Sequence, residues 1–278
     1  MSQILKEWKN GNYYVEIHSN GTKIRYTYDK ITPKLKPEFP ESLDIKITNY
    51  CEQNCPYCHE KSNSKGDHCD LDILFKRLEG IPAAEIAIGG GNPLKHPKLK
   101  EILMELRNRN FIPNMTVNEK SLRKNDLKTL QEYIDGKLIF GLGISWNGGK
   151  NIIKYKNSVA HMIAGIHNYN EIENAADLYG KILILGYKNF GRGKEFIAKN
   201  NKEITNNINS LNYNLWKLLM KKNVIISFDN LAIEQLEVKK HLSEKEWNKF
   251  YMGDEGSFTM YYDAVKDMFA KSSIDERK

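Results

Sequence analysis

Residues 43–58, LDIKITNYCEQNCPYC, join an apolar strand pattern to three closely spaced cysteines of a chain that has four. Apolar and polar residues alternate over 43–48, which predicts a β-strand that buries one face. The cysteines that follow are Cys51, Cys55 and Cys58. In α/β folds the loops at the carboxyl ends of strands carry the chemistry. A loop with this spacing can turn all three sulfurs toward one inorganic centre.

The same strand begins a regular alternation of strand and helix patterns. Strands are predicted at 43–48, 85–88, 112–118, 138–146, 178–187 and 223–229. Helices are predicted at 71–80, 97–110, 123–134, 157–169, 205–222 and 230–241. This order predicts a parallel sheet covered by helices. At roughly 30 residues per βα unit the region fits six units, as an open barrel or a doubly wound sheet.

The two ends of the chain depart from this alternation. Residues 11–29 contain two β-rich runs around Asn20-Gly21, a strong hairpin signal, and a proline-rich linker follows. The C-terminal stretch predicts a short helix, then a strand at 257–263 and a charged end. We therefore expect a single domain over 1–278, made of an N-terminal hairpin and linker (1–40), a core (41–240) and a C-terminal extension (241–278).

Composition limits the cellular compartment and the kinds of partner to be expected. The net charge of +7 comes from lysines spread along the chain, which indicates a solvated surface and does not demand an anionic partner. No apolar run approaches the ~20 residues of a membrane helix, and the N-terminus lacks a signal-peptide pattern. We expect a cytoplasmic protein without a membrane partner. Clustered cysteines in that compartment indicate metal binding or catalysis rather than disulfides.

Two inorganic centres fit three clustered cysteines. A zinc ion would need a fourth ligand, for which His59, His68 and Cys69 are the nearby candidates. A four-iron cluster can instead be held by three cysteines, which leaves one iron open to an exogenous ligand. An open coordination position is typical of a catalytic site.

CEQNCPYC, with Tyr57 directly before its third cysteine, resembles the cluster-binding motif of the radical S-adenosylmethionine (radical SAM) enzymes. The resemblance implies a partial (β/α)6 TIM-type barrel and a 4Fe–4S cluster on Cys51, Cys55 and Cys58. It also implies that S-adenosylmethionine chelates the open iron and is cleaved reductively to a 5′-deoxyadenosyl radical. A flavodoxin or ferredoxin would supply the electron.

Later segments extend the resemblance to the S-adenosylmethionine site. GGGNP, residues 89–93, stands where the family has Gly-Gly-Glu-Pro, so Gly90, Gly91 and Asn92 are expected at the methionine end of the ligand. An amide oxygen at Asn92 can accept the bond of the ligand ammonium, without charge assistance. The remaining expected contacts are Tyr57 beside the cluster, Asn118, Ser145 and Asn147 near the nucleoside, and Lys188 or Arg192 near a carboxylate or an anionic substrate.

The resemblance implies hydrogen-atom abstraction from a substrate, and the sequence does not name that substrate. A small molecule, such as a nucleotide or modified-base precursor, fits a compact chain with one cluster, while nucleic acid and peptide stay open. One alternative is a peptide-modifying maturase without auxiliary clusters, because no cysteine follows Cys69. The other alternative is a zinc-stabilised nucleic-acid-binding protein.

Overall fold

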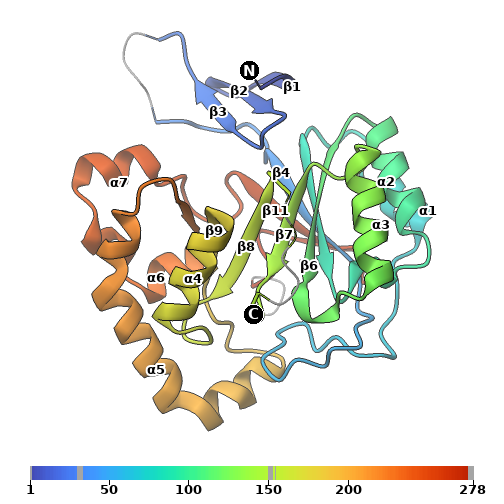
Figure 1. Cartoon of the computed structure of the whole chain (residues 1–278). Helices are drawn as coiled ribbons and strands as arrows, with labels where there is room; N and C mark the ends of the chain where they lie inside the picture. The colour runs from blue at the N-terminus through green and yellow to red at the C-terminus, as the bar shows by residue number, and fades with distance from the viewer. Residues whose placement is uncertain (1, 30–33, 150–152, 154, 275–278) are drawn as a thin grey trace.

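The computed structural model describes residues 2–29, 34–149, 153 and 155–274, which form two sheets. A small antiparallel sheet holds the N-terminal strands β1 (Ile4–Asn10), β2 (Tyr13–His18) and β3 (Lys23–Tyr26). A larger sheet of nine strands forms the body of the molecule (Figure 1). The predicted N-terminal hairpin is confirmed as the β2–β3 pair, which turns through Asn20-Gly21.

The larger sheet has the order β10-β9-β8-β7-β6-β5-β4-β11-β12, and its described pairs are parallel except β11–β12. Its strands are β4 (Ser42–Thr48), β5 (Glu85–Gly90), β6 (Ile112–Asn118), β7 (Gly141–Ser145), β8 (Ser158–Ile163), β9 (Lys181–Leu185), β10 (Ile225–Phe228), β11 (Thr259–Asp263) and β12 (Met268–Ala270). From β4 to β10 neighbours in the sheet are also neighbours in the chain. The predicted parallel βα arrangement is therefore confirmed.

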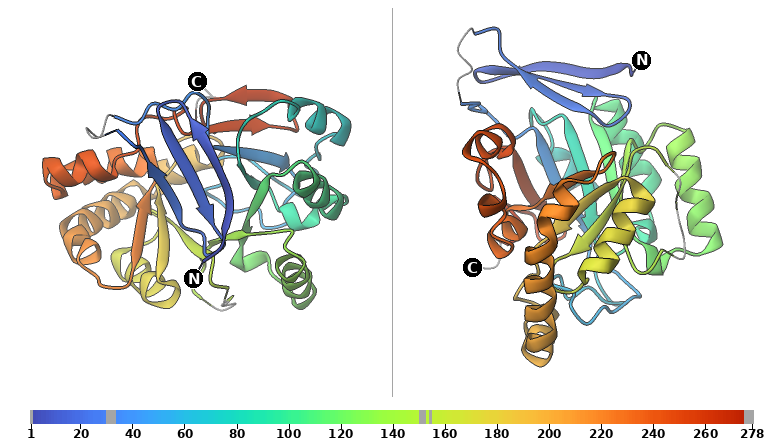
Figure 2. Two further views of the ribbon diagram at one scale, coloured as in Figure 1. Left: turned by 90° about the horizontal axis from the view of Figure 1, so that it is seen from above. Right: turned by 60° about the vertical axis from the view of Figure 1, so that its left-hand side comes forward.

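Helices cover the outer face of this sheet in two groups, α1 to α3 over one half and α4 to α6 over the other (Figures 1 and 2). The helices are α1 (Leu71–Arg77), α2 (Leu99–Asn108), α3 (Lys124–Asp135), α4 (Tyr169–Tyr179), α5 (Arg192–Leu219), α6 (Asn230–Gln235) and α7 (Glu244–Phe250), with short 3-10 turns η1 (Pro93–Lys95), η2 (Glu119–Ser121) and η3 (Val238–His241). Within the described residues, none of them has the length and apolar character needed to cross a bilayer.

The inner face of the sheet surrounds a cavity of about 1020 Å³. Residues from β4 through β11 line it, which requires the sheet to curve around it. The sheet ends at β10 on one side and β12 on the other, so over the described residues it does not close on itself. The predicted partial TIM-type barrel is confirmed, and the six predicted segments are joined in its parallel sheet by β8 and by β11 of the C-terminal extension.

The prediction of a helix over 157–169 is wrong. Residues 158–163 form β8, in which Ser158, Ala160 and Met162 are buried in strict alternation. Small residues weaken an alternating apolar pattern, and this one was mistaken for a helical period. The following helix, α4, begins only at Tyr169, after a capping box between Asn168 and Glu171.

The C-terminal extension completes one edge of the sheet. The predicted short helix and strand are confirmed as α7 and β11, and β12 follows as an unpredicted strand. β11 pairs in parallel with β4, from Thr259 opposite Ser42 to Asp263 opposite Lys46. The extension therefore lies beside the strand that leads into the cysteines.

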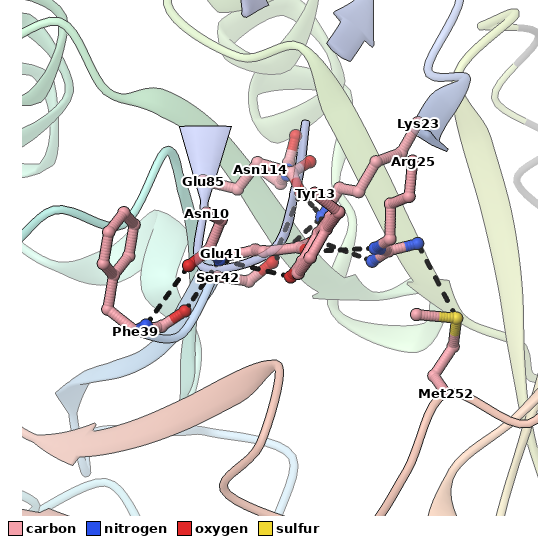
Figure 3. Close-up of polar contacts among 10 residues, drawn as sticks. All are labelled: Asn10, Tyr13, Lys23, Arg25, Phe39, Glu41, Ser42, Glu85, Asn114 and Met252. Carbon is pink, nitrogen blue, oxygen red and sulfur yellow. Dashed lines mark hydrogen bonds and ion pairs between the residues drawn. The ribbon is translucent and has the colours of Figure 1, made fainter. Parts of the chain in front are cut away.

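The small N-terminal sheet lies over the amino ends of the parallel strands, opposite the cysteine loop (Figure 1). A buried polar network, drawn in Figure 3, joins it to β4. Glu41, with no exposed surface, accepts hydrogen bonds from the Tyr13 hydroxyl (2.6 Å) and from Arg25 Nε and Nη2 (2.8 and 2.7 Å). Lys23 Nζ lies 3.4 Å from the same carboxylate. Burial alone would raise the pKa of Glu41, but the Arg25 hydrogen bond and the Lys23 charge hold it below its ordinary value.

Candidate active site

The cysteine loop, residues 49–70, connects β4 to α1 at the carboxyl end of the sheet (Figure 1). It is folded back on its own start: Cys51 N donates to Asn63 O (2.9 Å), and Cys69 N donates to Ile47 O (2.9 Å). Within the loop, Cys58 N donates to Cys55 O (3.1 Å). Main-chain bonds thus fix the path of the segment that carries the three clustered cysteines.

The three cysteines are half-buried free thiols. Burial raises the pKa of Cys51 and Cys55, and the neighbouring Cys58 raises both further. Soft thiolate donors suit an iron–sulfur cluster. Among the described residues, no group of three or more His, Cys, Asp or Glu side chains is arranged to hold a metal ion. Ligation by these cysteines stays a prediction.

The GGGNP turn after β5 lies directly against the beginning of the cysteine loop. Gly91 N donates to Thr48 O (2.7 Å), and Asn92 N donates to Tyr50 O (2.6 Å). A Cβ on Gly91 would lie 2.2 Å from Tyr50 O, and Gly90 has a φ of +117°. Only glycine permits this approach without displacement of the backbone. The two segments singled out from the sequence are therefore joined through their main chains.

Asn92 is buried between these two segments, with 4% of its surface exposed. Its Nδ2 donates to Glu52 Oε2 at 3.3 Å. Its Oδ1 is buried and has no hydrogen-bond partner among the described residues. An unpaired buried acceptor is costly, so it marks a place where a ligand donor would be stabilised.

Asn118, Ser145 and Asn147 are brought together at the carboxyl ends of β6 and β7. Asn118 and Ser145 are partners in register, and Asn147 Nδ2 donates to Asn118 Oδ1 and to Ser145 O (both 3.1 Å). Glu119, which the sequence did not single out, accepts from Asn147 N (2.8 Å). The predicted proximity of the three residues is present, while their contact with a nucleoside stays a prediction.

Tyr57 and Lys188 lie on the side of the loop that faces β9 and α5. The Tyr57 ring packs edge-on against Phe196 at 5.7 Å, and burial, reinforced by Cys55 and Cys58, raises its pKa to about 12. Lys188 Nζ lies 3.2 Å from His59 Nε2 and donates to Ser273 Oγ (2.6 Å). Both side chains are close to the cysteine loop, and their predicted contacts with S-adenosylmethionine are untested.

Arg192 contacts the cysteine loop, and its expected contact with a carboxylate or an anionic substrate stays a prediction. Its Nε donates to Cys55 O and its Nη2 to Ser62 O, both at 2.9 Å. Its backbone N donates to Cys58 O (3.1 Å). The guanidinium at the start of α5 therefore braces the cysteine loop.

The candidate fourth ligands for zinc have other contacts in the fold. His68 Nδ1 lies 2.9 Å from Thr48 Oγ1, and His59 Nε2 lies 3.3 Å from Glu60 Oε1. Cys69 belongs to the apolar core, where burial raises its thiol pKa to about 12. Cys69 is thus an inert thiol of the core.

The cavity inside the barrel carries charged groups that sequence reasoning missed. Lys46 is 2% exposed and pairs with Asp263 (2.5 Å) and Glu60 (2.9 Å). Asp44 is exposed to the cavity, and its position away from bulk water inside the barrel raises its pKa to about 6. Burial lowers the pKa of His161 to about 4, so His161 is neutral at pH 7. Polar residues alternating through LDIKIT were the available signal for Asp44 and Lys46. His161 was missed because its strand was predicted as a helix.

Comparisons with known proteins agree with this arrangement. The model of the radical SAM superfamily matches residues 45–189. A probable GTP 3′,8-cyclase of Methanothermobacter thermautotrophicus is 31% identical over 74 residues, covering 25% of this chain and 24% of the cyclase.

Solved structures of Streptococcus suis SuiB share the fold. SuiB bound to S-adenosylmethionine aligns with 82% of this chain and 59% of its own, with a TM-score of 0.53 at 12% identity. SuiB bound to the precursor peptide SuiA gives a TM-score of 0.52 at 13% identity over 82% of this chain and 58% of its own. The chain thus spans about a quarter of the cyclase and under two thirds of these SuiB chains.

Proposed function

This chain belongs to the radical SAM superfamily, and from that membership we propose that it cleaves S-adenosylmethionine reductively at a single 4Fe–4S cluster and abstracts a hydrogen atom from a substrate in the barrel. One observation carries the proposal: the GGGNP turn is bonded by its main chain to the start of the cysteine loop. A cluster on the loop and a small molecule on the turn would therefore be neighbours.

Cys51, Cys55 and Cys58 would hold the cluster, and Gly90, Gly91 and Asn92 would hold the methionine end of S-adenosylmethionine. Residues at the ends of the next strands, Asn118, Ser145 and Asn147, would face its nucleoside. When bound, these cofactors supply the electron-transfer and radical chemistry that side chains lack. The cofactor proposal rests on family membership, on the free thiols and on the unpaired Asn92 Oδ1.

The chain itself would support the cluster site through Arg192. Its guanidinium holds the carbonyls of Cys55 and Ser62 in place. An external flavodoxin or ferredoxin would deliver the electron.

For the substrate, we favour a small polar molecule such as a nucleotide or modified-base precursor. The cavity of about 1020 Å³ is of small-molecule size and carries charges of both signs, from Asp44, Lys46 and Glu85 among others. The archaeal relative described above is a probable GTP 3′,8-cyclase, an enzyme named for a nucleotide substrate. A peptide is the second candidate, because SuiB was solved with a precursor peptide on the same fold.

Anaerobic reconstitution with iron and sulfide tests the cluster. We expect absorbance near ~400 nm from thiolate-bound iron, lost in Cys55→Ala and retained in Cys69→Ala, whose thiol lies in the core. The dithionite-reduced wild type should then form 5′-deoxyadenosine from S-adenosylmethionine. Stoichiometric zinc without iron uptake would instead support the zinc-stabilised binding protein and refute the enzyme.

A further inference from the structure

Asn92 stands where the resemblance led us to expect an acid, and the structure brings a different acid to it. Glu52 follows Cys51 directly in the chain, and its Oε2 accepts a hydrogen bond from Asn92 Nδ2 at 3.3 Å. We propose that Asn92 and Glu52 together form the acceptor for the ammonium group of S-adenosylmethionine. Asn92 Oδ1 makes the direct bond, and Glu52 supplies the negative charge that an amide lacks. This inference rests on the proposed function.

The bond to Glu52 fixes which way the Asn92 amide points. A carboxylate oxygen accepts hydrogen bonds, so the amide nitrogen must face Glu52 and the amide oxygen must face away from it. That oxygen is buried and has no partner among the described residues. A donor-only ammonium group would satisfy it and gain attraction from the nearby carboxylate.

Main-chain bonds hold the pair in this arrangement. Asn92 N donates to Tyr50 O at 2.6 Å, two residues before Glu52. The missing Cβ of Gly91 allows this approach, because a methyl group there would lie 2.2 Å from the same Tyr50 oxygen. The distance between the side chains at 52 and 92 is thus set by the backbone of both segments.

Within the described residues Glu52 forms no salt bridge. The Glu52 charge contributes to the raised pKa of Lys95, but a hydrogen bond to Asp126 is the larger cause. Lys95 Nζ lies 2.9 Å from Asp126 Oδ1. Because Lys95 is held by Asp126, the Glu52 charge remains available to a cationic ligand.

The test is the dissociation constant of S-adenosylmethionine, measured by anaerobic calorimetry on the oxidised, cluster-loaded protein, where no turnover occurs. We expect Glu52→Gln to weaken binding roughly tenfold, since the attraction between the Glu52 carboxylate and the ligand ammonium group is lost while the Asn92 Oδ1 bond remains. In the double variant Glu52→Gln with Asn92→Glu, the dissociation constant should return to within roughly threefold of the wild-type value, because position 92 now carries the acid. Glu101→Gln, an exposed acid on α2, is the matched control and should bind as the wild type does.

An analogue of S-adenosylmethionine without its amino group sharpens the assignment. Glu52→Gln should bind this analogue as well as the wild type does, because the analogue lacks the ammonium group that the Glu52 carboxylate attracts. The proposal is overturned if Glu52→Gln retains wild-type affinity for S-adenosylmethionine, or if the variant loses iron. Wild-type protein that takes up no iron, or that takes up iron but binds no S-adenosylmethionine, would refute the proposed function itself.

Discussion

Two buried acceptors at opposite ends of the partial barrel, Glu41 and Asn92, differ in their hydrogen-bond partners. At the amino end, the Glu41 carboxylate is fully buried and is paired with Tyr13, Arg25 and Lys23. At the carboxyl end, Asn92 Oδ1 is buried without a partner among the described residues. The seven-residue strand β4 connects the two ends: it begins directly after Glu41 and ends at Thr48, whose carbonyl accepts a hydrogen bond from Gly91 N.

This difference separates stability from binding. A network whose members all have partners stabilises the fold and has little to offer a ligand. Unpaired acceptors cost stability and are retained where a ligand completes them. We therefore expect substitutions at the amino end to lower the free energy of unfolding, and substitutions at the carboxyl end to affect ligand and cluster binding more.

The largest expected effect on stability is that of Glu41→Gln. Removing the charge leaves Arg25 and Lys23 beside a neutral group and should lower the free energy of unfolding by about 3 kcal/mol. Urea denaturation measures this loss. Binding of S-adenosylmethionine at 25 °C should be unchanged, and a loss of affinity in the folded variant would contradict the separation of the two ends.

The pH dependence of that loss provides its control. The pKa of Glu41 is held below its ordinary value in the folded protein. The ionised carboxylate therefore stabilises the fold fully at pH values above the ordinary pKa, and this stabilisation is lost as the pH falls through the lowered pKa. The difference between wild type and Glu41→Gln should therefore be largest at neutral pH and shrink in acid. A difference that stays constant from pH 7 to pH 3 would show that the charge is not its source.

The next effect in size is expected for Gly91→Ala, with Gly89→Ala as its matched control. A Cβ at Gly91 would lie 2.2 Å from Tyr50 O, whereas one at Gly89 would meet no atom within 4 Å. Displacement of the turn should cost about 2 kcal/mol of unfolding free energy and abolish measurable S-adenosylmethionine binding. Calorimetry and denaturation on both variants test this. Equal behaviour of the two would contradict the close contact.

The smallest effect on stability is expected for Arg192→Ala. Loss of the guanidinium bonds to Cys55 O and Ser62 O should cost about 1 kcal/mol, because the side chain is partly exposed. The reconstituted variant should lose iron to a chelator faster than the wild type. Lys194→Ala, at an exposed site on the same helix, should match the wild type in chelation rate. Unchanged iron retention in Arg192→Ala would contradict the view that Arg192 stabilises the cysteine loop.

Much of the fold followed from local patterns in the sequence. The alternation in residues 43–48 predicted β4, and the cysteines were correctly expected in the loop after it. The prediction for the segment around β8 was wrong, because its inward-facing residues include the polar Ser158 and the small Ala160, which make its two-residue period inconspicuous. Most of α4 was missed with it.

The site was less predictable, because its contacts join segments far apart in the chain. The pattern GGGNP identified Gly90, Gly91 and Asn92, but nothing local indicated that Asn92 would meet Glu52. Arg192 was singled out for its charge, but nothing local indicated that its guanidinium would bond to backbone carbonyls of the cysteine loop. Such pairings depend on how strands align across a sheet, which residue types alone do not encode.

The main-chain bonds of the GGGNP turn also bear on how this site could change over evolution. Gly91 N to Thr48 O and Asn92 N to Tyr50 O hold the turn without any use of the side chain at position 92. A mutation there alters what the turn presents and leaves the turn itself in place. An acid could thus be exchanged for an amide while the scaffold persists, and a charge one loop away would be enough to compensate. Sequence searches keyed to that acid would overlook such lineages.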